Sequence, residues 1–341
     1  RDIREAASMN TDAGRTLASA LTDYAALTTR KAQLGALDDL LLKWSDTSGM
    51  PTMIDRALAA RFIPEFIFGS VTRSTKADVF ASTYQNTNVG DAYNIMKLYD
   101  DMQDPEYMGW INKLSVLERF NGREFIKFTT PVITPEAWLE VKDPNAPGTG
   151  GLISYYRTRV LIHQYGRMDM LKQSYQALRD SVYDALLPQT RLKPYLDAIS
   201  VTVDAGGNVS LDFTGMETAF NTATAANGLK GITDLVDLLE IKSQSLREGG
   251  WKGWAYLGNT LGTVTHTPEI TARLNELNII STGYQGVTNV IGSGRDDIII
   301  GTTANETLLG GAGNDRLYGG DGDDTITGGE GRDQFYGGAG N

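Results

Sequence analysis

Acidic residues recur every nine positions between residues 292 and 341. The second residue after each acid is a large apolar one. The acids are Asp297, Glu306, Asp315, Asp324 and Asp333, and the apolar residues are Ile299, Leu308, Leu317, Ile326 and Phe335. Carboxylate and carbonyl oxygens suit Ca²⁺, a hard ion that takes about six to eight oxygen ligands, better than they suit zinc. We therefore expect calcium sites along this segment.

Glycine-rich turns precede the acids, most clearly at residues 310–315 and 319–324. The repeat is G-G-x-G-x-D-x-U-x, where U is apolar. Glycine adopts backbone conformations that are closed to other residues, so such a turn can aim its carbonyl oxygens inward. The turn glycines that we expect to supply metal ligands are Gly311, Gly313, Gly320, Gly322, Gly329 and Gly331.

The repeat predicts a parallel β-roll in which two nonapeptides make one turn. Each apolar residue then points into a narrow core, and each ion lies between successive turns. The expected edges are Asp297, Asp315 and Asp333 on one side, with Glu306 and Asp324 on the other. The early turns depart from the pattern at Ser293 and Arg295, and residues 301–306 lose glycines and carry the longer Glu306. We expect these coils to act as caps, with Glu306 as the weakest ligand.

The repeat segment is strongly acidic, with nine Asp or Glu and three Arg residues, a net charge of −6. Such acid density repels itself without cations, so we expect the calcium-free segment to be largely unfolded and the energy of binding to appear as folding energy. A flexible Gly/Asp-rich linker is the simpler alternative. A linker, however, has no reason to keep five acids and five apolar residues in strict register.

Composition limits the remaining possibilities. The chain of 341 residues has a net charge of −11 and a pI near 4.8, which argues against nucleic acid and anionic membranes as partners. It has no cysteine, so metal is the expected staple if the protein is secreted. No apolar run approaches the roughly 18 residues of a membrane-spanning helix. We see no signal peptide, and both ends look cut, as in a fragment of a longer protein.

The residues ahead of the repeats are expected to be mostly helical. Amphipathic patterns predict helices over residues 28–45, 88–102, 108–120, 152–187, 215–226, 232–246 and 267–277. Alternating residues at 201–203 and 209–213 predict a β-hairpin around Gly206 and Gly207. We therefore expect an α+β multidomain chain: a helical domain at 1–147, a helical and β-hairpin region at 148–291 that caps the roll, and a truncated calcium-binding roll at 292–341.

The repeats resemble the RTX (repeats-in-toxin) nonapeptides of proteins exported by type I secretion in Gram-negative bacteria. Residues 1–7, 31–44, 189–196 and 211–213 are similar to the region ahead of the repeats in iron-regulated, FrpC-type RTX proteins. The resemblance implies a secreted, extracellular or cell-surface protein that leaves the cell unfolded through the type I apparatus and folds outside. It implies no catalytic activity. The self-processing module that cleaves Asp-Pro bonds in the FrpC type is not recognisable here, although Asp104-Pro105 and Asp143-Pro144 exist.

Other candidate sites have simpler explanations. We expect His163 to be a packing or surface residue of the 152–187 helix and His266 to be a turn residue. The aromatic cluster of Trp251, Trp254 and Tyr256 suits a platform for carbohydrate or a protein partner, but burial against the roll is the favoured interpretation. No catalytic constellation is recognisable, so we assign no catalytic residues.

The leading hypothesis is a non-enzymatic, calcium-dependent segment of a secreted RTX protein, in which Ca²⁺ triggers folding and the helical region caps the roll. The second makes the helical region a module of an adhesin or toxin that binds a host or bacterial surface protein or glycan. A hydrolase is the third and least supported. The sequence does not distinguish a toxin, an adhesin and a bacteriocin as the parent protein.

Overall fold

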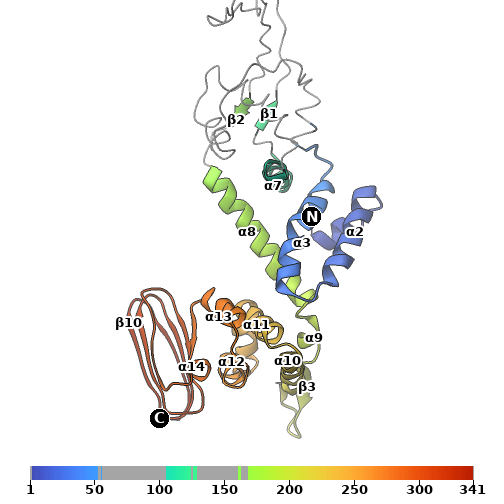
Figure 1. Ribbon diagram of the computed structural model, residues 1–341. Coiled ribbons are helices and arrows are strands. Elements are labelled where there is room, and N and C mark those ends of the chain that lie inside the picture. Colours follow the sequence, from blue (N-terminus) through green and yellow to red (C-terminus); the bar gives the residue numbers. More distant parts are fainter. Residues whose placement is uncertain are drawn as a thin grey trace, which may run out of the picture. The chain divides into compact units, whose positions relative to one another are not determined.

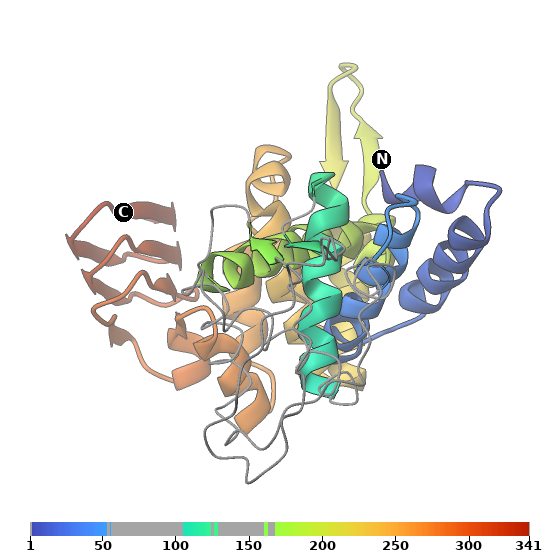
Figure 2. The ribbon, with the colours of Figure 1, turned by 90° about the horizontal axis from the view of Figure 1, so that it is seen from above.

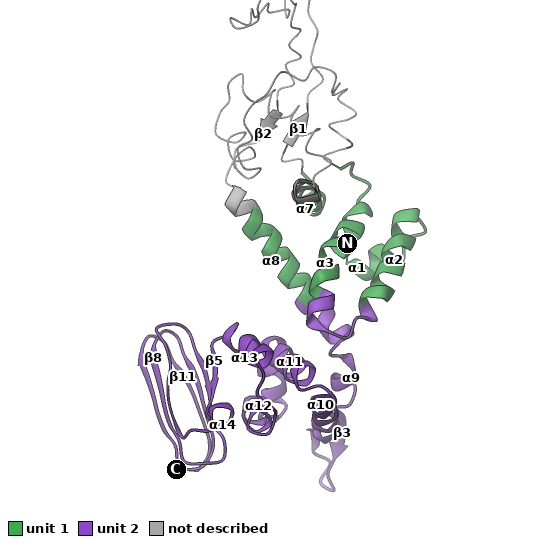
Figure 3. Cartoon of the chain, viewed as in Figure 1, with its two compact units in different colours: residues 1–24, 34–183 green, residues 25–33, 184–341 purple. Residues whose placement is uncertain are grey.

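The structure is a computed structural model that describes residues 2–52, 55, 105–123, 126–128, 160–162 and 168–340 (Figure 1). The chain forms two compact units (Figure 3). Unit 1 comprises residues 1–24 and 34–183, and unit 2 comprises residues 25–33 and 184–341. Each unit is described separately below.

Unit 1 is built mainly from helices. They are α1 (Ile3–Ala7), α2 (Asp12–Ala25), α3 (Arg30–Asp46), α7 (Pro105–Asn121) and α8 (Met168–Leu186). Leu17, Leu37, Leu41 and Leu114 from these helices are at most 1% exposed. Each buried leucine stabilises the fold by about 1.5–3 kcal/mol relative to an exposed one. The core of unit 1 therefore draws on residues far apart in the sequence.

The predicted helices of this unit are partly confirmed. The helices expected at 28–45 and 108–120 correspond to α3 and α7. The helix expected at 152–187 is confirmed over Met168–Leu186 but wrong at β2 (Val160–Ile162), which pairs antiparallel with β1 (Ile126–Phe128). A run of three apolar residues suits a strand as well as a helix, and here the distant partner strand decides between them. The helix expected at 88–102, His163, Asp104 and the pair Asp143-Pro144 lie outside the described residues, whereas Pro105 begins α7.

The first part of unit 2 is helical. It contains η2 (Leu187–Gln189), α9 (Lys193–Leu196), α10 (Thr214–Ala226), α11 (Gly228–Glu248), α12 (Gly253–Leu261), α13 (Pro268–Asn275) and α14 (Thr282–Gln285). The helices expected at 215–226, 232–246 and 267–277 are confirmed as α10, α11 and α13. Two begin at side-chain caps, where Asn227 accepts from Lys230 N–H and Thr267 accepts from Ile270 N–H. Met216, Phe220 and Leu235 form part of the buried core.

An ion network is buried among these helices. Arg191, on the loop before α9, pairs with Asp234 and Asp237 of α11, and these three side chains are at most 2% exposed. Arg273 of α13 donates to Asp237 at 2.6 Å and to Glu240 at 2.8 Å. Buried charges are tolerated when each is paired and hydrogen-bonded, so the network fixes how α11 and α13 meet.

The predicted β-hairpin is confirmed. Strand β3 (Ser200–Val203) pairs antiparallel with β4 (Val209–Asp212), and the hairpin extends away from α10 (Figure 2). The pairing register of β3 and β4 places four aliphatic side chains on one face of the hairpin. They are Val201, Val203, Val209 and Leu211, which are 63%, 64%, 69% and 40% exposed. This face is therefore largely open to solvent.

The C-terminal part of unit 2 is a parallel β-roll, as the repeat predicts (Figures 1 and 2). Its strands are β5 (Ile279–Ser281), β6 (Asn289–Ile291), β7 (Ile298–Ile300), β8 (Thr307–Ala312), β9 (Arg316–Asp321), β10 (Thr325–Glu330) and β11 (Gln334–Ala339). One sheet has the order β11-β9-β7-β5 and the other β10-β8-β6. Leu308 pairs with Ile326 and Leu317 with Phe335, so each turn of the roll contains two nonapeptides.

The core of the roll is a stripe of apolar residues at the U position of the repeat. Ile299, Leu308 and Leu317 are 0% exposed, Val290 is 4% exposed, and Ile326 packs against them. Phe335 keeps the register but is 54% exposed. Because only one side chain per nonapeptide enters this core, the turns that join the strands must supply much of the stability.

Candidate calcium sites

The turns of the roll owe their shape to glycine. All six predicted turn glycines have a positive φ, between 105° and 131°. At Gly329, a side chain would also clash with the carbonyl oxygen of Gly311, one turn earlier. Residues with a Cβ rarely adopt this backbone conformation and would not fit this close approach of two turns. The glycines therefore let successive turns stack with their carbonyl groups close together.

The acids line the two edges of the roll in the predicted grouping. On one edge, the N–H of Asp297 donates to Oδ1 of Asp315 at 2.9 Å, and the N–H of Asp315 donates to Oδ1 of Asp333 at 3.0 Å. On the other, the N–H of Glu306 donates to Oδ1 of Asp324 at 2.9 Å. Each bond joins residues 18 positions apart, which is one full turn. The carboxylates of Asp315, Asp324 and Asp333 thus each use one oxygen to accept a hydrogen bond from the preceding turn of the roll.

The second oxygen of several of these carboxylates makes no hydrogen bond to any residue that the structure describes. Oδ2 of Asp315, Oδ2 of Asp324 and Oε2 of Glu306 are buried, and none has a hydrogen-bond partner among the described residues. A buried carboxylate oxygen without a partner is costly, so these atoms call for a cation. They are the best indication that the residues of the roll suit a metal ion.

Electrostatics supports the same conclusion. Burial raises the pKa of Asp315, and the nearby carboxylates of Asp297 and Asp333 raise it further. Burial likewise raises the pKa of Glu306, with a contribution from Asp324. Stacked carboxylates in a low-dielectric edge favour protonation unless a positive ion lies between them. A divalent cation offsets both the cost of burying the charged carboxylates and the repulsion between them.

The first glycine of each repeat adds a feature that the sequence analysis missed. A Cβ at Gly310 would clash with both Oδ2 of Asp315 and the carbonyl oxygen of Gly328. A Cβ at Gly319 would clash with Oδ2 of Asp324 and the carbonyl oxygen of Gly337. The unpartnered carboxylate oxygen and a carbonyl from the next turn therefore converge on a space that any side chain would fill. The paired glycines are visible in the sequence, but the conformational argument for the turn selects only the second of each pair, because the role of the first depends on the next turn of the roll.

Carbonyl oxygens must complete the coordination. Within the described part of the chain, no three side chains of His, Cys, Asp or Glu come together as a metal-binding group. Each edge instead offers one carboxylate per turn and a row of glycine carbonyls. Such an all-oxygen ligand set is the kind that Ca²⁺ accepts.

The first acid of each edge is already hydrogen-bonded. Ser293 Oγ donates to Asp297 Oδ1 at 3.1 Å or to Oδ2 at 2.9 Å, and the N–H of Ser293 donates to Oδ2 at 2.6 Å. Oε1 of Glu306 accepts from the N–H of Thr302 at 3.0 Å and from both Thr302 Oγ1 and Thr282 Oγ1. Hydroxyl groups thus occupy positions that glycines hold in the later turns. This placement suits the predicted role of the early coils as caps.

Asx side chains form a second ladder that the sequence analysis did not predict. The residues before Asp297, Glu306 and Asp315 each bond to the same position one turn later. Asp296 Oδ1 accepts from the N–H of Asn314 at 2.7 Å, and Asn314 Oδ1 accepts from the N–H of Arg332 at 3.1 Å. Asn305 Oδ1 accepts from the N–H of Asp323 at 2.9 Å on the other edge. These bonds need no metal, so they stabilise the stack independently of any cation.

Comparison with known proteins identifies the roll. The family model for the RTX calcium-binding nonapeptide repeat, four copies, matches residues 282–317, 291–326 and 309–341. Residues 282–341 are RTX calcium-binding repeats. The predicted resemblance of the repeats and the predicted cofactor, Ca²⁺, are thereby confirmed: the C-terminal segment of the chain consists of calcium-binding repeats of the RTX type. No solved structure matches the chain.

A curated relative extends the RTX similarity beyond the roll. The chain is 25% identical over 239 residues to the iron-regulated protein FrpA of Neisseria meningitidis serogroup C. The alignment covers 70% of this chain and 18% of FrpA, so the chain spans less than a fifth of that relative's length. Among the described residues, no helix has both the length and the apolar character needed to span a bilayer.

The two tryptophans of the aromatic cluster ahead of the RTX roll are buried. Trp251 and Trp254 are 4% and 5% exposed, and the ring of Trp254 lies 5.4 Å from that of Tyr318 on the roll. Trp251 Nε1–H donates to Glu217 at 2.9 Å, and Tyr256 donates to the carbonyl of the same residue at 2.9 Å. Burial against the roll was the favoured interpretation, and the contact of Trp254 with Tyr318 agrees with it. The two tryptophans therefore do not form an exposed platform.

Proposed function

We propose that this chain is a segment of a type I-secreted RTX protein in which Ca²⁺ triggers folding of the roll after export. The observation that carries the proposal is the set of buried carboxylate oxygens without partners on Glu306, Asp315 and Asp324. A roll without cations would retain these desolvated, mutually repelling groups. With Ca²⁺ bound, the same groups become ligands, so the free energy of binding contributes directly to folding.

We assign the metal sites to the predicted acids and turn glycines of the roll. Asp315, Asp324 and Asp333 stand in complete glycine turns, whereas Asp297 and Glu306 accept hydrogen bonds from hydroxyl groups. The later acids therefore supply the stronger ligands. The carbonyl groups of glycines such as Gly328 and Gly337, beside Asp315 and Asp324, complete the oxygen shell.

The helical region acts as the cap of the roll. Ile298 and Ile300 point away from the roll's own core, and yet they are 3% and 0% exposed. Gly258 of α12 lies so close to Gly301 and Ile300 that an added Cβ would be 2.6 Å from the Gly301 carbonyl oxygen. The surface formed by α12 thus covers the first coil of the roll. It offers a nucleus onto which the later coils can fold one after another.

The division into residues 1–147, 148–291 and 292–341 stays a prediction, as does the extracellular or cell-surface location. We infer that the segment has a non-enzymatic role and that the parent protein is a toxin, an adhesin or a bacteriocin. Similarity to FrpA supports the RTX background of the parent protein but not its task.

Calcium titration of chelated protein tests the proposal. Ca²⁺ should raise the β signal in circular dichroism and the resistance of residues 292–341 to protease, whereas equal Mg²⁺ should do little, because Mg²⁺ demands a smaller octahedral shell. Protease resistance that is unchanged by EDTA would overturn the folding role. Asp315→Asn, which keeps the shape of the side chain, serves as the variant with a weakened site.

A further inference from the structure

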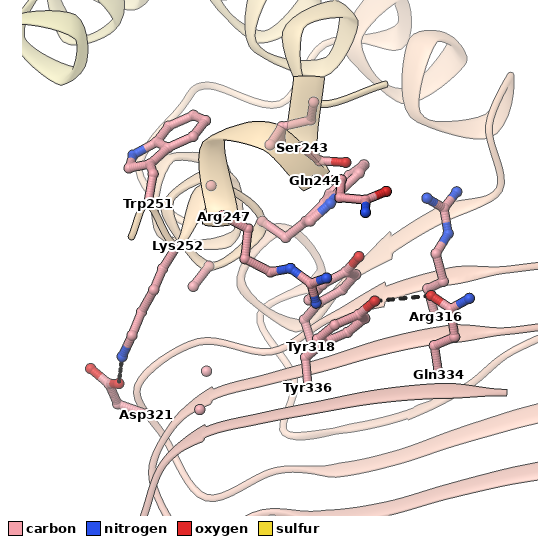
Figure 4. A pocket seen from close by; sticks show the side chains of 16 residues that line it. Ser243, Gln244, Arg247, Trp251, Lys252, Arg316, Tyr318, Asp321, Gln334 and Tyr336 are labelled. Carbon is pink, nitrogen blue, oxygen red and sulfur yellow. Dashed lines mark hydrogen bonds and ion pairs between the residues drawn. The ribbon is translucent and has the colours of Figure 1, made fainter. Parts of the chain in front are cut away.

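A cavity of about 670 Å³ lies within unit 2, where the end of α11 and the start of α12 face the outer side of β9 and β11 (Figure 4). Ser243, Gln244 and Arg247 come from the helical side. Arg316, Tyr318, Gln334 and Tyr336 come from the roll. A space of this size is typical of small-molecule sites.

One wall of the cavity is aromatic. Tyr318 and Tyr336 occupy equivalent positions one turn apart, and their rings stack with centroids 4.5 Å apart and planes 5° apart. Trp254 continues the stack on the helical side, 5.4 Å from Tyr318. Their faces are covered by each other, by Trp254 and by Arg247, but both tyrosines are only partly buried, so the outer edges of the stacked rings remain available to a ligand. The row of aromatic edges forms an apolar surface that suits the C–H face of a sugar ring.

Two guanidinium groups adjoin this wall. Arg247 lies over the ring of Tyr336 (Figure 4), with its Cζ 4.9 Å from the centroid. Arg316 Cζ lies 5.8 Å from the centroid of Trp254. None of the ion pairs in the described part of the chain involves either arginine, whereas the neighbouring Lys252 pairs with Asp321 at 3.7 Å. In a chain with a net charge of −11, two arginines without an acidic partner at one cavity are unusual. A guanidinium fork matches the two oxygens of a carboxylate.

Polar groups between the arginines suit sugar hydroxyls. Gln334 Oε1 accepts from the hydroxyl of Tyr336 at 2.9 Å, which leaves its amide N–H groups as donors (Figure 4). Ser243 and Gln244 face the same space from α11. The lining thus combines an apolar platform, a positive charge and neutral hydrogen-bonding groups.

We propose that this cavity binds a carboxylated pyranose, such as a sialic or uronic acid, with Arg247 and Arg316 on the carboxylate and the tyrosine stack against the ring. The site rests on the proposed function, because Arg316 directly follows Asp315 and Gln334 directly follows Asp333. Unless Ca²⁺ folds these turns, half of the lining is missing. Sugar binding therefore requires calcium, and by linkage the sugar tightens calcium binding by the same factor.

Calorimetry on the full chain in saturating Ca²⁺ tests the site with N-acetylneuraminic acid, glucuronic acid and neutral methyl glucoside. Both acids should bind, and the glucoside should bind at least about tenfold more weakly, the typical effect of losing a charged hydrogen bond. Comparing the affinities of the two acids shows whether the cavity prefers a sialic acid or a uronic acid. No binding of either acid to folded protein, or equal binding of the glucoside, would overturn the proposal.

Variants locate the binding. Arg316→Gln and Tyr336→Ala should each weaken acid binding about tenfold, while Arg332→Gln, which removes an exposed arginine that does not line the cavity, should leave it unchanged. Equal loss in Arg316→Gln and Arg332→Gln would show only non-specific attraction to charge and would contradict the site. Circular dichroism of each sample reports folding of the roll separately. A roll that folds without calcium would contradict the proposed function, and a calcium-folded roll that binds no acid would contradict this inference alone.

Discussion

The N–H of Asp315 donates to Oδ1 of Asp333, one turn later, at 3.0 Å, while Oδ2 of Asp315 is buried and has no partner among the described residues. A single position in the repeat therefore performs two tasks. The backbone N–H of Asp315 joins successive turns through its bond to Asp333. The Oδ2 atom of Asp315 remains available as a ligand for a cation. Glu306 repeats the arrangement on the opposite edge, where its N–H donates to Oδ1 of Asp324 and its Oε2 is buried without a partner among the described residues. The two edges of the roll should therefore respond to calcium together.

The acids should differ in their contribution to calcium binding. Asp315→Ala should weaken calcium binding by about tenfold or more, and Glu306→Ala should weaken it less. Thr302 and Thr282 already satisfy one oxygen of Glu306, whereas Asp315 lies between two further carboxylates in glycine-rich turns. Titration followed by circular dichroism measures both midpoints. Equal shifts would contradict this ranking of the ligands.

A methyl group at Gly310 should be as damaging as loss of an acid. Gly310→Ala places a Cβ against both Asp315 Oδ2 and the Gly328 carbonyl oxygen, so calcium should bind far more weakly. Gly337→Ala is the matched control, because it changes the same position of a later repeat but meets no atom within 4 Å. Calorimetry with Ca²⁺ compares the two. Similar affinities in both variants would show that the space beside Asp315 does not hold the ion.

Acid should have opposite effects on the calcium-free and calcium-bound roll. Burial raises the pKa of Asp315 and of Glu306 in the folded state, so protonation favours the folded calcium-free roll. This stabilisation is fully present below the ordinary pKa of about 4 and is lost as the pH rises through the raised values. Chelated protein should thus be better folded near pH 4 than near pH 7.

Calcium binding should show the reverse trend with pH. Because the ion needs ionised carboxylates, the calcium concentration at the midpoint of folding should rise as the pH falls from 7 towards about 4. Circular dichroism at a series of pH values, with and without EDTA, measures both effects. A midpoint that does not change with pH in the parent chain would contradict the assigned ligands, and Asp315→Asn should show a weaker dependence.

The buried ion network should be essential to the stability of unit 2. Arg191→Met leaves Asp234 and Asp237 without their shared partner in a site that is at most 2% exposed, so it should cost about 3 kcal/mol or more. Lys193→Met, which breaks an exposed pair with Asp197, should cost less than about 1 kcal/mol. Denaturant unfolding of both variants in calcium measures the difference. Similar losses would show that the network does not hold these helices.

Local patterns in the sequence were sufficient for several elements. The Thr267-Pro268 start of α13 and the turn between β3 and β4 depend on residues within a few positions of each other. The strand at Val160–Ile162 could not be predicted in the same way, because its conformation depends on pairing with Ile126–Phe128, and three apolar residues have no periodicity of their own.

The sequence by itself determined the roll. Its contacts repeat every 18 residues between equivalent positions, so a nine-residue period suffices to place the apolar residues from Ile299 to Ile326 in the core and each acid on its edge. Only the tertiary structure decided what happens where the repeat meets the rest of unit 2. There the burial of Trp254 against Tyr318 and the position of Arg247 over Tyr336 depend on side chains from unrelated segments. No period in the sequence relates such segments, because packing between them follows from shape and charge in three dimensions.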